Sequence, residues 1–166
     1  MAVTAEALVL VGRSSGPPPA DAPTLELALT ADERTRLRGL RHTRCGRSVL
    51  LQLPRSQPLV PGEWLHAEPS ASGPLPWVQV VAAPEPLMVV RAPDGLALLQ
   101  AAYHLGNRHV AMEIHPQELR LLNDPVLAHL LEHRGLSLAT IEAPFHPESG
   151  AYGHAHSHAP SNSHEH

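Results

Sequence analysis

Residues Leu87 to Ala143 spell LMVVRAPDGLALLQAAYHLGNRHVAMEIHPQELRLLNDPVLAHLLEHRGLSLATIEA and decide the fold of the chain. Short apolar runs bounded by turn residues predict four strands in this stretch. They cover residues 87–91, 110–114, 118–122 and 137–143. Two segments between them have the apolar spacing of helices, which gives the order βαββαβ. This order is that of a ferredoxin-like split sheet with its helices on one face.

Local signals mark the ends of both predicted helices. Asp94 is a suitable N-cap for the first helix, which carries Leu96, Leu99 and Tyr103 on one face. Asp124 and Pro125 form an N-cap and first-turn pair for the second helix. Gly135 ends this helix, whose apolar arc consists of Val126, Leu127, Leu130 and Leu131.

The chain before residue 85 has a different pattern of apolar and turn-forming residues. Residues 24–84 contain short apolar runs broken by prolines and glycines, which predicts a small β-rich domain. Thr30 and Glu33 fit a capping box for a helical turn or two. Residues 1–23 are predicted to be a flexible leader with little core-forming content. We therefore expect an α+β protein with a β-rich domain at 24–84, a ferredoxin-like domain at 85–147 and a disordered histidine-rich tail at 148–166.

Composition directs attention to histidine. The chain has 13 histidines and one cysteine, Cys45, which excludes an intramolecular disulfide and a multi-thiolate metal site within one chain. Imidazole suits nickel, copper and zinc. The net charge of -4 argues against a nucleic-acid binder, and the arginine-rich stretch 34–47 is expected to be solvated surface, with an anionic partner as the alternative. Short apolar runs and the absence of a signal-peptide pattern predict a cytoplasmic protein that does not enter the membrane.

The C-terminal tail concentrates these imidazoles. Its five histidines are His154, His156, His158, His164 and His166. Small and polar residues between them leave the tail little to bury, so we expect it to be disordered until several imidazoles close on one ion. An expression tag is the alternative, but tags are usually uninterrupted histidine runs, and this tail is interrupted by other residues. A native metal-binding tail is the better interpretation.

A carrier that discriminates between metals also needs a ligand fixed on the folded domain, and His109 is the candidate. It follows Gly106 and Asn107, which supply a helix-ending turn, and it precedes a predicted strand. By spacing alone, a histidine at such a turn is more often a capping or surface residue than a ligand.

The sequence around His109 resembles a known family. The motif 104–109, HLGNRH, together with Asp124, Val126-Leu127, the stretch APF at 143–145 and the stretch PESGAY at 147–152, is similar to the urease accessory protein E family, the nickel metallochaperones of urease maturation. Weaker similarity upstream extends the resemblance over about residues 24 to 158.

The resemblance implies a homodimer in which His109 of each subunit binds one Ni(II) ion at the two-fold axis and tail histidines complete the shell. His104 matches the first histidine of the motif. It can bind the metal, or alternatively orient or pack against the residues that do. Other family members carry further metal-binding histidines before the second helix, but this chain has Leu122-Asn123-Asp124-Pro125 there. The implied partners are the family's accessory GTPase and the urease assembly complex. In such a carrier, the β-rich domain at 24–84 would serve protein contacts.

Rival functions make distinct predictions. A histidine-rich buffer that stores metal without a client would depend on the tail alone. A zinc hydrolase needs three fixed ligands and an open water position, and the sequence offers one convincing fixed histidine per chain. His129 and His133 lie four apart on the second predicted helix, a spacing that can chelate a metal, but their place beside an apolar arc favours solvated side chains. We find no catalytic constellation, and we predict that the protein is not an enzyme. Cu(II) and Zn(II) compete with Ni(II) for such ligands.

Overall fold

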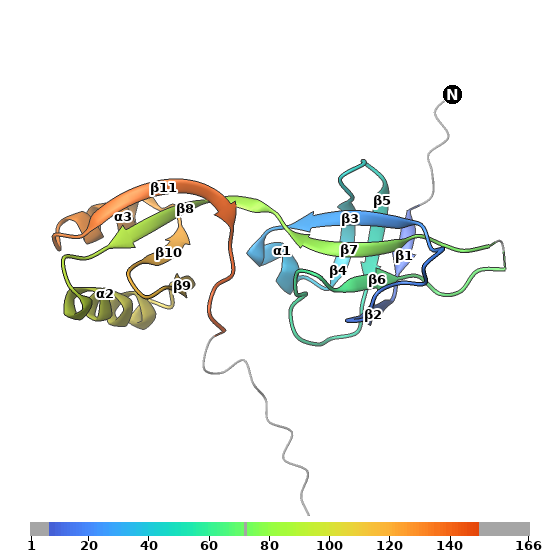
Figure 1. The fold of residues 1–166 in the computed structure, drawn as a ribbon, viewed down its shortest axis with the longest axis horizontal. Coiled ribbons are helices and arrows are strands. Elements are labelled where there is room, and N and C mark those ends of the chain that lie inside the picture. The colour runs from blue at the N-terminus through green and yellow to red at the C-terminus, as the bar shows by residue number, and fades with distance from the viewer. Residues whose placement is uncertain (1–6, 72, 150–166) are drawn as a thin grey trace, which may run out of the picture.

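The computed structural model describes residues 7–71 and 73–149. Two domains follow each other along the chain and lie at opposite ends of an elongated molecule (Figure 1). The long strand β8, Pro84–Arg91, begins at the junction and continues into the second domain. The mixed α+β composition and the two-domain order predicted above are confirmed.

Two sheets build the first domain. One contains β1 (Leu8–Leu10), β5 (Ser48–Gln52) and β4 (Arg38–His42), in that order. The other contains β2 (Gly12–Ser14), β6 (Trp64–His66), β7 (Trp77–Ala82) and β3 (Thr24–Leu29). Side chains of β1, β3, β5, β6 and β7 point into a shared core, with alternate residues buried as expected for strands with one buried face. The buried core consists of Leu8, Leu10, Leu27, Leu29, Val49, Leu51, Leu53, Leu59, Leu65, Val78 and Val80.

The first domain also corrects the prediction of a leader over residues 1–23. Strand β1 pairs in parallel with β5, and β2 pairs with β6 in antiparallel fashion. Leu10 is fully buried and Leu8 is nearly so. The prediction failed because a three-residue strand is too short to show periodicity, and both pairings join segments that are far apart in the sequence. Residues 1–6 lie outside the described residues.

The arginines of the stretch 34–47 do not all lie on a solvated surface. Helix α1, Ala31–Thr35, begins with the predicted capping box of Thr30 and Glu33. Arg34 lies in this helix and is buried, which contradicts the expectation for that residue. The following arginines lie at the end of α1, on strand β4 and in the turn after it, and most of them are exposed.

The second domain has the predicted βαββαβ order. Its sheet has the strand order β11 (Ser137–Pro144), β8, β10 (Leu119–Leu122), β9 (Met112–Ile114), with all neighbours antiparallel. Helices α2 (Gly95–Asn107) and α3 (Pro125–Glu132) pack on one face of it. Asp94 and Asp124 cap these helices as expected. The core between helices and sheet consists of Met88, Val90, Ala101, Leu105, Met112, Leu119, Leu121, Leu131 and Leu136.

The face of helix α2 that packs against the core is not the one that the sequence suggested. Leu96, Leu99 and Tyr103 share one face as predicted, but they are 66%, 69% and 67% exposed. Ala101 and Leu105 are buried instead. The helix is apolar on both sides, so spacing defines a face without showing which face meets the sheet.

Hydrogen bonds cross the junction between the domains. Arg34 of the first domain donates from Nη2 to the carbonyl oxygen of Phe145 in the second at 2.5 Å, and from Nη1 to that of Leu29 in its own domain at 3.1 Å. The backbone N–H of Ala31 donates to Oε1 of Glu85 at 2.7 Å. Burial lowers the pKa of Arg34, and the nearby Glu85 carboxylate acts in the opposite direction. Among residues 7–71 and 73–149, no helix is long and apolar enough to cross a bilayer.

Candidate metal-binding site

His109 lies in the turn that ends helix α2. Its backbone N–H donates to the carbonyl of Gly106 at 2.9 Å, and the N–H of Val110 donates to the carbonyl of Leu105 at 3.1 Å. These two bonds form a Schellman motif in which Arg108 is the C-cap and His109 is the next residue. The second bond also explains why strand β9 begins at Met112 and not at the predicted residue 110.

The backbone of His109 adopts a conformation that usually belongs to glycine. Its φ is +56°, and His109 is the only non-glycine residue with positive φ in the described part of the chain. A residue with a Cβ atom loses about 1 to 2 kcal/mol in this region relative to the right-handed helix. The imidazole is exposed at the end of the helix. A strained backbone that presents a metal-binding side chain to solvent is typical of a functional position.

His104 occupies the last turn of the same helix. Its side chain is half-buried, and its ring lies edge-on to that of Tyr103, with ring centroids 5.5 Å apart. This ring contact is a packing interaction, and the metal-binding role of His104 stays a prediction.

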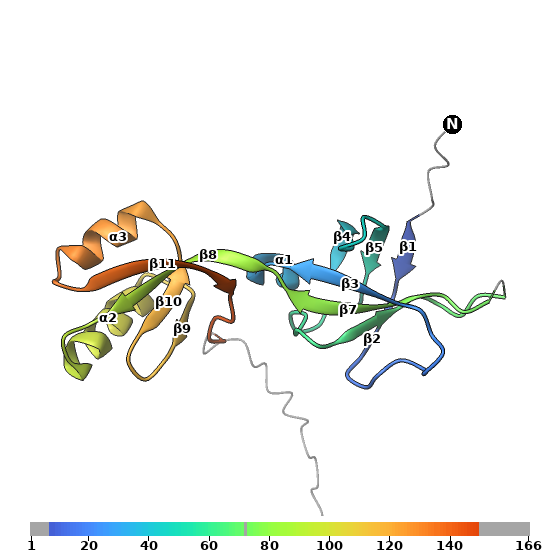
Figure 2. The same cartoon turned by 45° about the horizontal axis from the view of Figure 1, so that its top comes forward.

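The segment after β11 turns back and is fastened to the edge of the sheet. Phe145 is buried, and the backbone N–H of His146 donates to Oε1 of Glu113 at 2.7 Å. The N–H of Glu148 then donates to the carbonyl of Met112 at 2.8 Å. Figures 1 and 2 both show this segment descending beside the junction. The chain that leads to the histidine tail therefore starts next to β9, the strand that follows His109.

Glu113 supports this fastening electrostatically. Burial raises the pKa of its carboxyl, but the hydrogen bonds from His115 and from the N–H of His146, with the charges of His115 and Arg120, outweigh burial and leave the pKa below its ordinary value. The His115 Nε2 atom lies 2.8 Å from Oε2 of Glu113. Glu113 is thus an ionised acceptor that holds the last described segment. Sequence reasoning missed it, because the contact joins residues far apart in the chain.

The described residues do not contain all of the predicted ligands. His154, His156, His158, His164 and His166 lie outside the described residues. Within residues 7–71 and 73–149, no three histidine, cysteine or carboxylate side chains gather in an arrangement that could hold a metal ion. His109 therefore presents one imidazole per chain.

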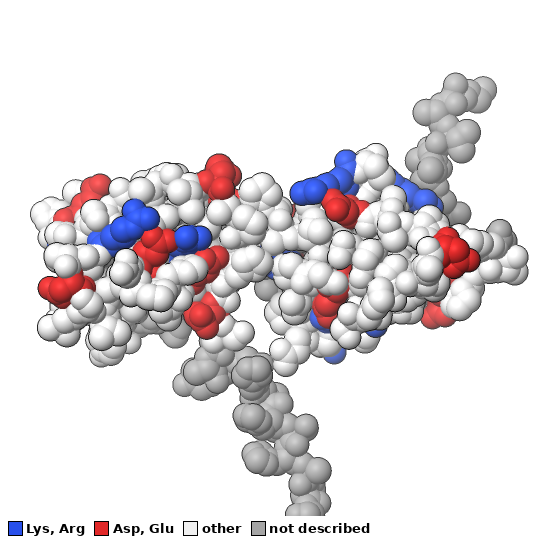
Figure 3. All heavy atoms as spheres, in the orientation of Figure 1, with Lys and Arg blue, Asp and Glu red and all other residues white. Residues whose placement is uncertain are grey.

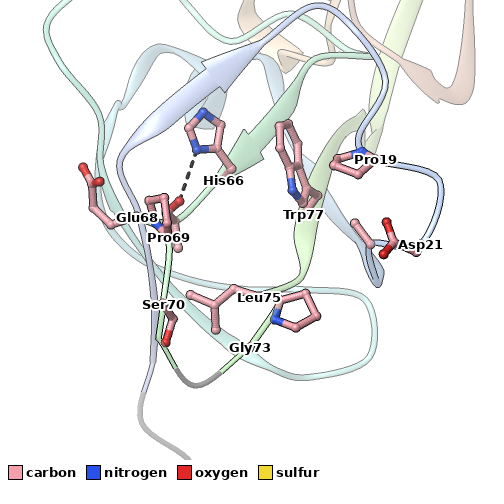
Figure 4. Close-up of a pocket in the computed structure, with 12 residues that line it drawn as sticks. Pro19, Asp21, His66, Glu68, Pro69, Ser70, Gly73, Leu75 and Trp77 are labelled. Atoms are coloured by element: carbon pink, nitrogen blue, oxygen red, sulfur yellow. Dashed lines mark hydrogen bonds between the residues drawn. The ribbon is translucent and has the colours of Figure 1, made fainter.

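One hollow of the first domain is lined by an aromatic pair. It has a volume of about 480 Å³ and lies between the loop at 68–76 and the turn that contains Pro19 and Asp21. Figure 4 shows the ring of Trp77 beside that of His66, with centroids 4.9 Å apart, and Leu75 below them. Its lining is mainly apolar. The hollow contains none of the predicted metal ligands, and it lies in the domain that we expect to contact other proteins.

Charged groups are dispersed on the face drawn in Figure 3. Arginines and carboxylates of both domains lie among uncharged side chains. Several charged groups of the described chain are paired: Arg91 and Arg120 both contact Glu118, and Arg13 contacts Glu63. The hydrogen bond from Arg120 is the main cause of a lowered pKa at Glu118, and Arg91 adds to it. A partner on this face would meet mostly uncharged atoms.

Comparison with known families gives matches over both domains. Residues 85–166 match the family described as UreE urease accessory protein, C-terminal domain. Residues 10–72 match the corresponding N-terminal domain family. The N-terminal match begins within the segment that the sequence had suggested to be a leader.

Individual relatives agree with these matches. The urease accessory protein UreE of Parasynechococcus marenigrum is 57% identical over 138 residues, which covers 82% of this chain and 89% of the relative. The protein of the same name from Thermosynechococcus vestitus is 50% identical over 132 residues, with 80% and 88% covered. That of a Nostoc species is 46% identical over 142 residues, with 86% and 94% covered.

Proposed function

Because this chain belongs to the UreE family of urease accessory proteins, we propose that it is a nickel-binding metallochaperone that delivers Ni(II) to apo-urease during assembly of the urease active site. Nickel is the cargo, and the protein acts as a carrier and not as an enzyme. The observation that supports this most directly is the exposed imidazole of His109 on a backbone with φ of +56°. Glycine would fit that turn with less strain, so the presence of histidine supports a role for its side chain.

A homodimer would bring two such imidazoles together. The exposed face of α2 formed by Leu96, Leu99 and Tyr103 leads along the helix toward the turn that contains His109. Exposed Ile114 on β9 and an apolar groove between α2 and β9 continue this surface. An apolar stripe of this kind favours burial against a second copy, and a two-fold contact through it pairs equivalent residues. Two His109 imidazoles would then share one ion.

Tail histidines would complete the coordination shell. Glu148 is fixed to Met112, which is three residues after His109, and His154 follows Glu148 by six residues. Six residues span at most about 20 Å, so His154 can reach His109 of its own subunit or of a partner. Because these ligands lie on the tail and not on the folded domain, their coordination positions can reopen, and the ion can then be transferred.

The choice of nickel rests on the family. Imidazole sites bind Cu(II) more tightly than Ni(II), and Zn(II) competes, so selectivity in the cell depends on geometry and availability. We place this function in the cytoplasm, where the carrier would meet the family's accessory GTPase and the urease assembly complex.

Nickel binding by the intact protein, by His109→Ala and by a variant with all five tail histidines replaced by alanine tests the proposal. We expect His109→Ala to lose the tightest site and to lose activation of apo-urease in a purified assay, because the fixed ligand is gone. His42→Ala is the control, since this exposed histidine lies in the first domain. Unchanged tight binding and activation by His109→Ala would refute the role of this residue.

The alternative function is a histidine-rich metal buffer without a dedicated client. It is favoured by the number of tail histidines, and it assigns no role to His109. In this case the tail variant would lose nearly all binding, His109→Ala would behave as the intact protein, and urease activity in the cell would not depend on the protein.

A further inference from the structure

We propose that His129 and His133 on helix α3 form a second metal site, a pair of imidazoles that chelates one divalent late transition-metal ion independently of His109 and the tail. Both side chains are exposed, and their ring centroids lie 5.1 Å apart.

The helix holds the two residues on one face. The N–H of His133 donates to the carbonyl of His129 at 3.1 Å, so the helical turn between them is intact. Residues four apart on a helix have neighbouring side chains, and the same spacing positions the two zinc-binding histidines of metalloprotease helices. Asp124 caps the start of α3, and Leu131 is buried against the sheet. These contacts fix the rotation of the helix and direct the pair outward.

The separation of the rings fits a shared ion. A nitrogen-to-metal bond of about 2.1 Å places an ion about 3.2 Å from a ring centroid, so two imidazoles bound at 90° to 110° have centroids about 4.5 to 5.2 Å apart. The observed 5.1 Å lies within this range. The rings are nearly perpendicular, at 85°, and rotation about the bond between each Cβ and its ring can direct one nitrogen from each toward a common point. Little of the backbone needs to move.

The pair lies away from His109. Strand β10 ends at Leu122, which pairs with Leu87 near the start of β8, so α3 begins on the junction side of the sheet. It ends near β11, whose first residue Ser137 pairs with Arg91 at the far end of β8. His109 precedes β9, and Met112 pairs with Leu121 toward the junction. The two sites therefore lie at opposite ends of the domain.

Two protein ligands leave the other positions to water, which gives a weak and rapidly exchanging site. The end of a helix carries partial negative charge that favours a bound cation, and the exposed carboxylate of Glu132 adds to it. The exposed guanidinium of Arg134 opposes it. We expect the affinity order Cu(II) above Ni(II), as for other nitrogen sites.

Residue-resolved footprinting of the full-length protein tests this site. Diethyl pyrocarbonate modifies free imidazole nitrogens, and mass spectrometry measures the rate at each histidine with and without Cu(II) or Ni(II). At free metal ten times the dissociation constant we expect modification of both His129 and His133 to slow by about tenfold. In His133→Ala, the remaining imidazole should bind about a hundredfold more weakly, because the second nitrogen no longer adds an intramolecular contact.

A variant with the same number of histidines provides the control. His133→Ala combined with Arg134→His changes the spacing from four to five residues, which moves the second imidazole off the face. It also removes a positive charge, so loss of protection in this variant cannot arise from repulsion of the ion. Protection of His129 that survives in either variant, or no protection of the intact pair up to millimolar metal, would overturn the proposal. Because the readout is specific to each residue, it is independent of whether His109 binds nickel.

Discussion

Replacing His109 by glycine should make the protein more stable while it removes the proposed fixed nickel ligand. The left-handed backbone of His109 costs a residue with a Cβ atom about 1 to 2 kcal/mol, and glycine avoids that cost. Glycine has more conformational freedom in the unfolded chain, which offsets about 0.5 to 1 kcal/mol. The net gain in the free energy of unfolding, taken as the difference between these ranges, is centred on about 0.75 kcal/mol, which corresponds to a rise of about 1.5 to 3 °C in Tm for a chain of this size.

His109→Ala is the matched variant, because it also removes the imidazole but keeps the Cβ atom and its strain. Urea unfolding of metal-free protein, at one fixed protomer concentration, should give a higher free energy for His109→Gly than for His109→Ala. Both variants should lose the tightest nickel site in calorimetric titration. Equal stability of the two variants would refute the assignment of strain to this turn. Retained tight binding in either one would refute its role as a ligand.

Three further changes test other parts of the structure. Arg34→Met removes the donors to Phe145 and Leu29 and leaves a buried carboxylate nearby, so we expect the free energy of unfolding in urea to fall by about 3 kcal/mol. The control Arg36→Ala, which removes one member of an exposed ion pair, should lose less than about 1 kcal/mol, and equal losses would contradict the stabilising role of Arg34 at the junction. Because the pKa of Glu113 is lowered in the folded protein, the ionised carboxylate stabilises the fold fully above its ordinary pKa of 4.5, and this stabilisation is lost as pH falls through the lowered pKa. The free energy of unfolding should therefore fall less steeply with acid in Glu113→Gln than in the intact protein. An unchanged pH profile would count against this contact. Leu99→Asp places a charge on the exposed stripe of α2. In analytical ultracentrifugation it should give a monomer at concentrations where the intact protein is a dimer. An unchanged dissociation constant of the dimer would exclude this stripe from the interface.

Much of the second domain was predictable from local patterns. Asp94 and Asp124 are polar residues at the boundary of apolar periodicity, and each accepts hydrogen bonds from the first turn of its helix. Four strands of limited length and two capped helices allow few arrangements, and the observed sheet order is the one that the ferredoxin-like interpretation requires. The position of His109 in a turn was equally visible, because Gly106 and Asn107 precede it.

Long-range contacts were not predictable from the same patterns. Leu8 and Leu10 are buried because β1 pairs with β5, about forty residues later in the chain, and nothing near them in sequence indicates that pairing. The positive φ of His109 was hidden for a different reason, since glycine is the residue that normally signals it. The link between Glu113 and the N–H of His146 depends on a side chain and a backbone group that meet only after the sheet forms.

The hydrogen bonds at the junction limit how freely the two domains can be exchanged between relatives. The carbonyl of Phe145, next to the fastened segment, depends on a guanidinium from the first domain, and Glu85 of the second accepts from the backbone of α1. A chimera that joins domains from two family members would keep the path of the last segment only if an arginine equivalent to Arg34 is retained. The domains match separate family patterns, yet in this chain the first domain helps to determine where the C-terminal segment of the second begins, because Arg34 binds the carbonyl of Phe145.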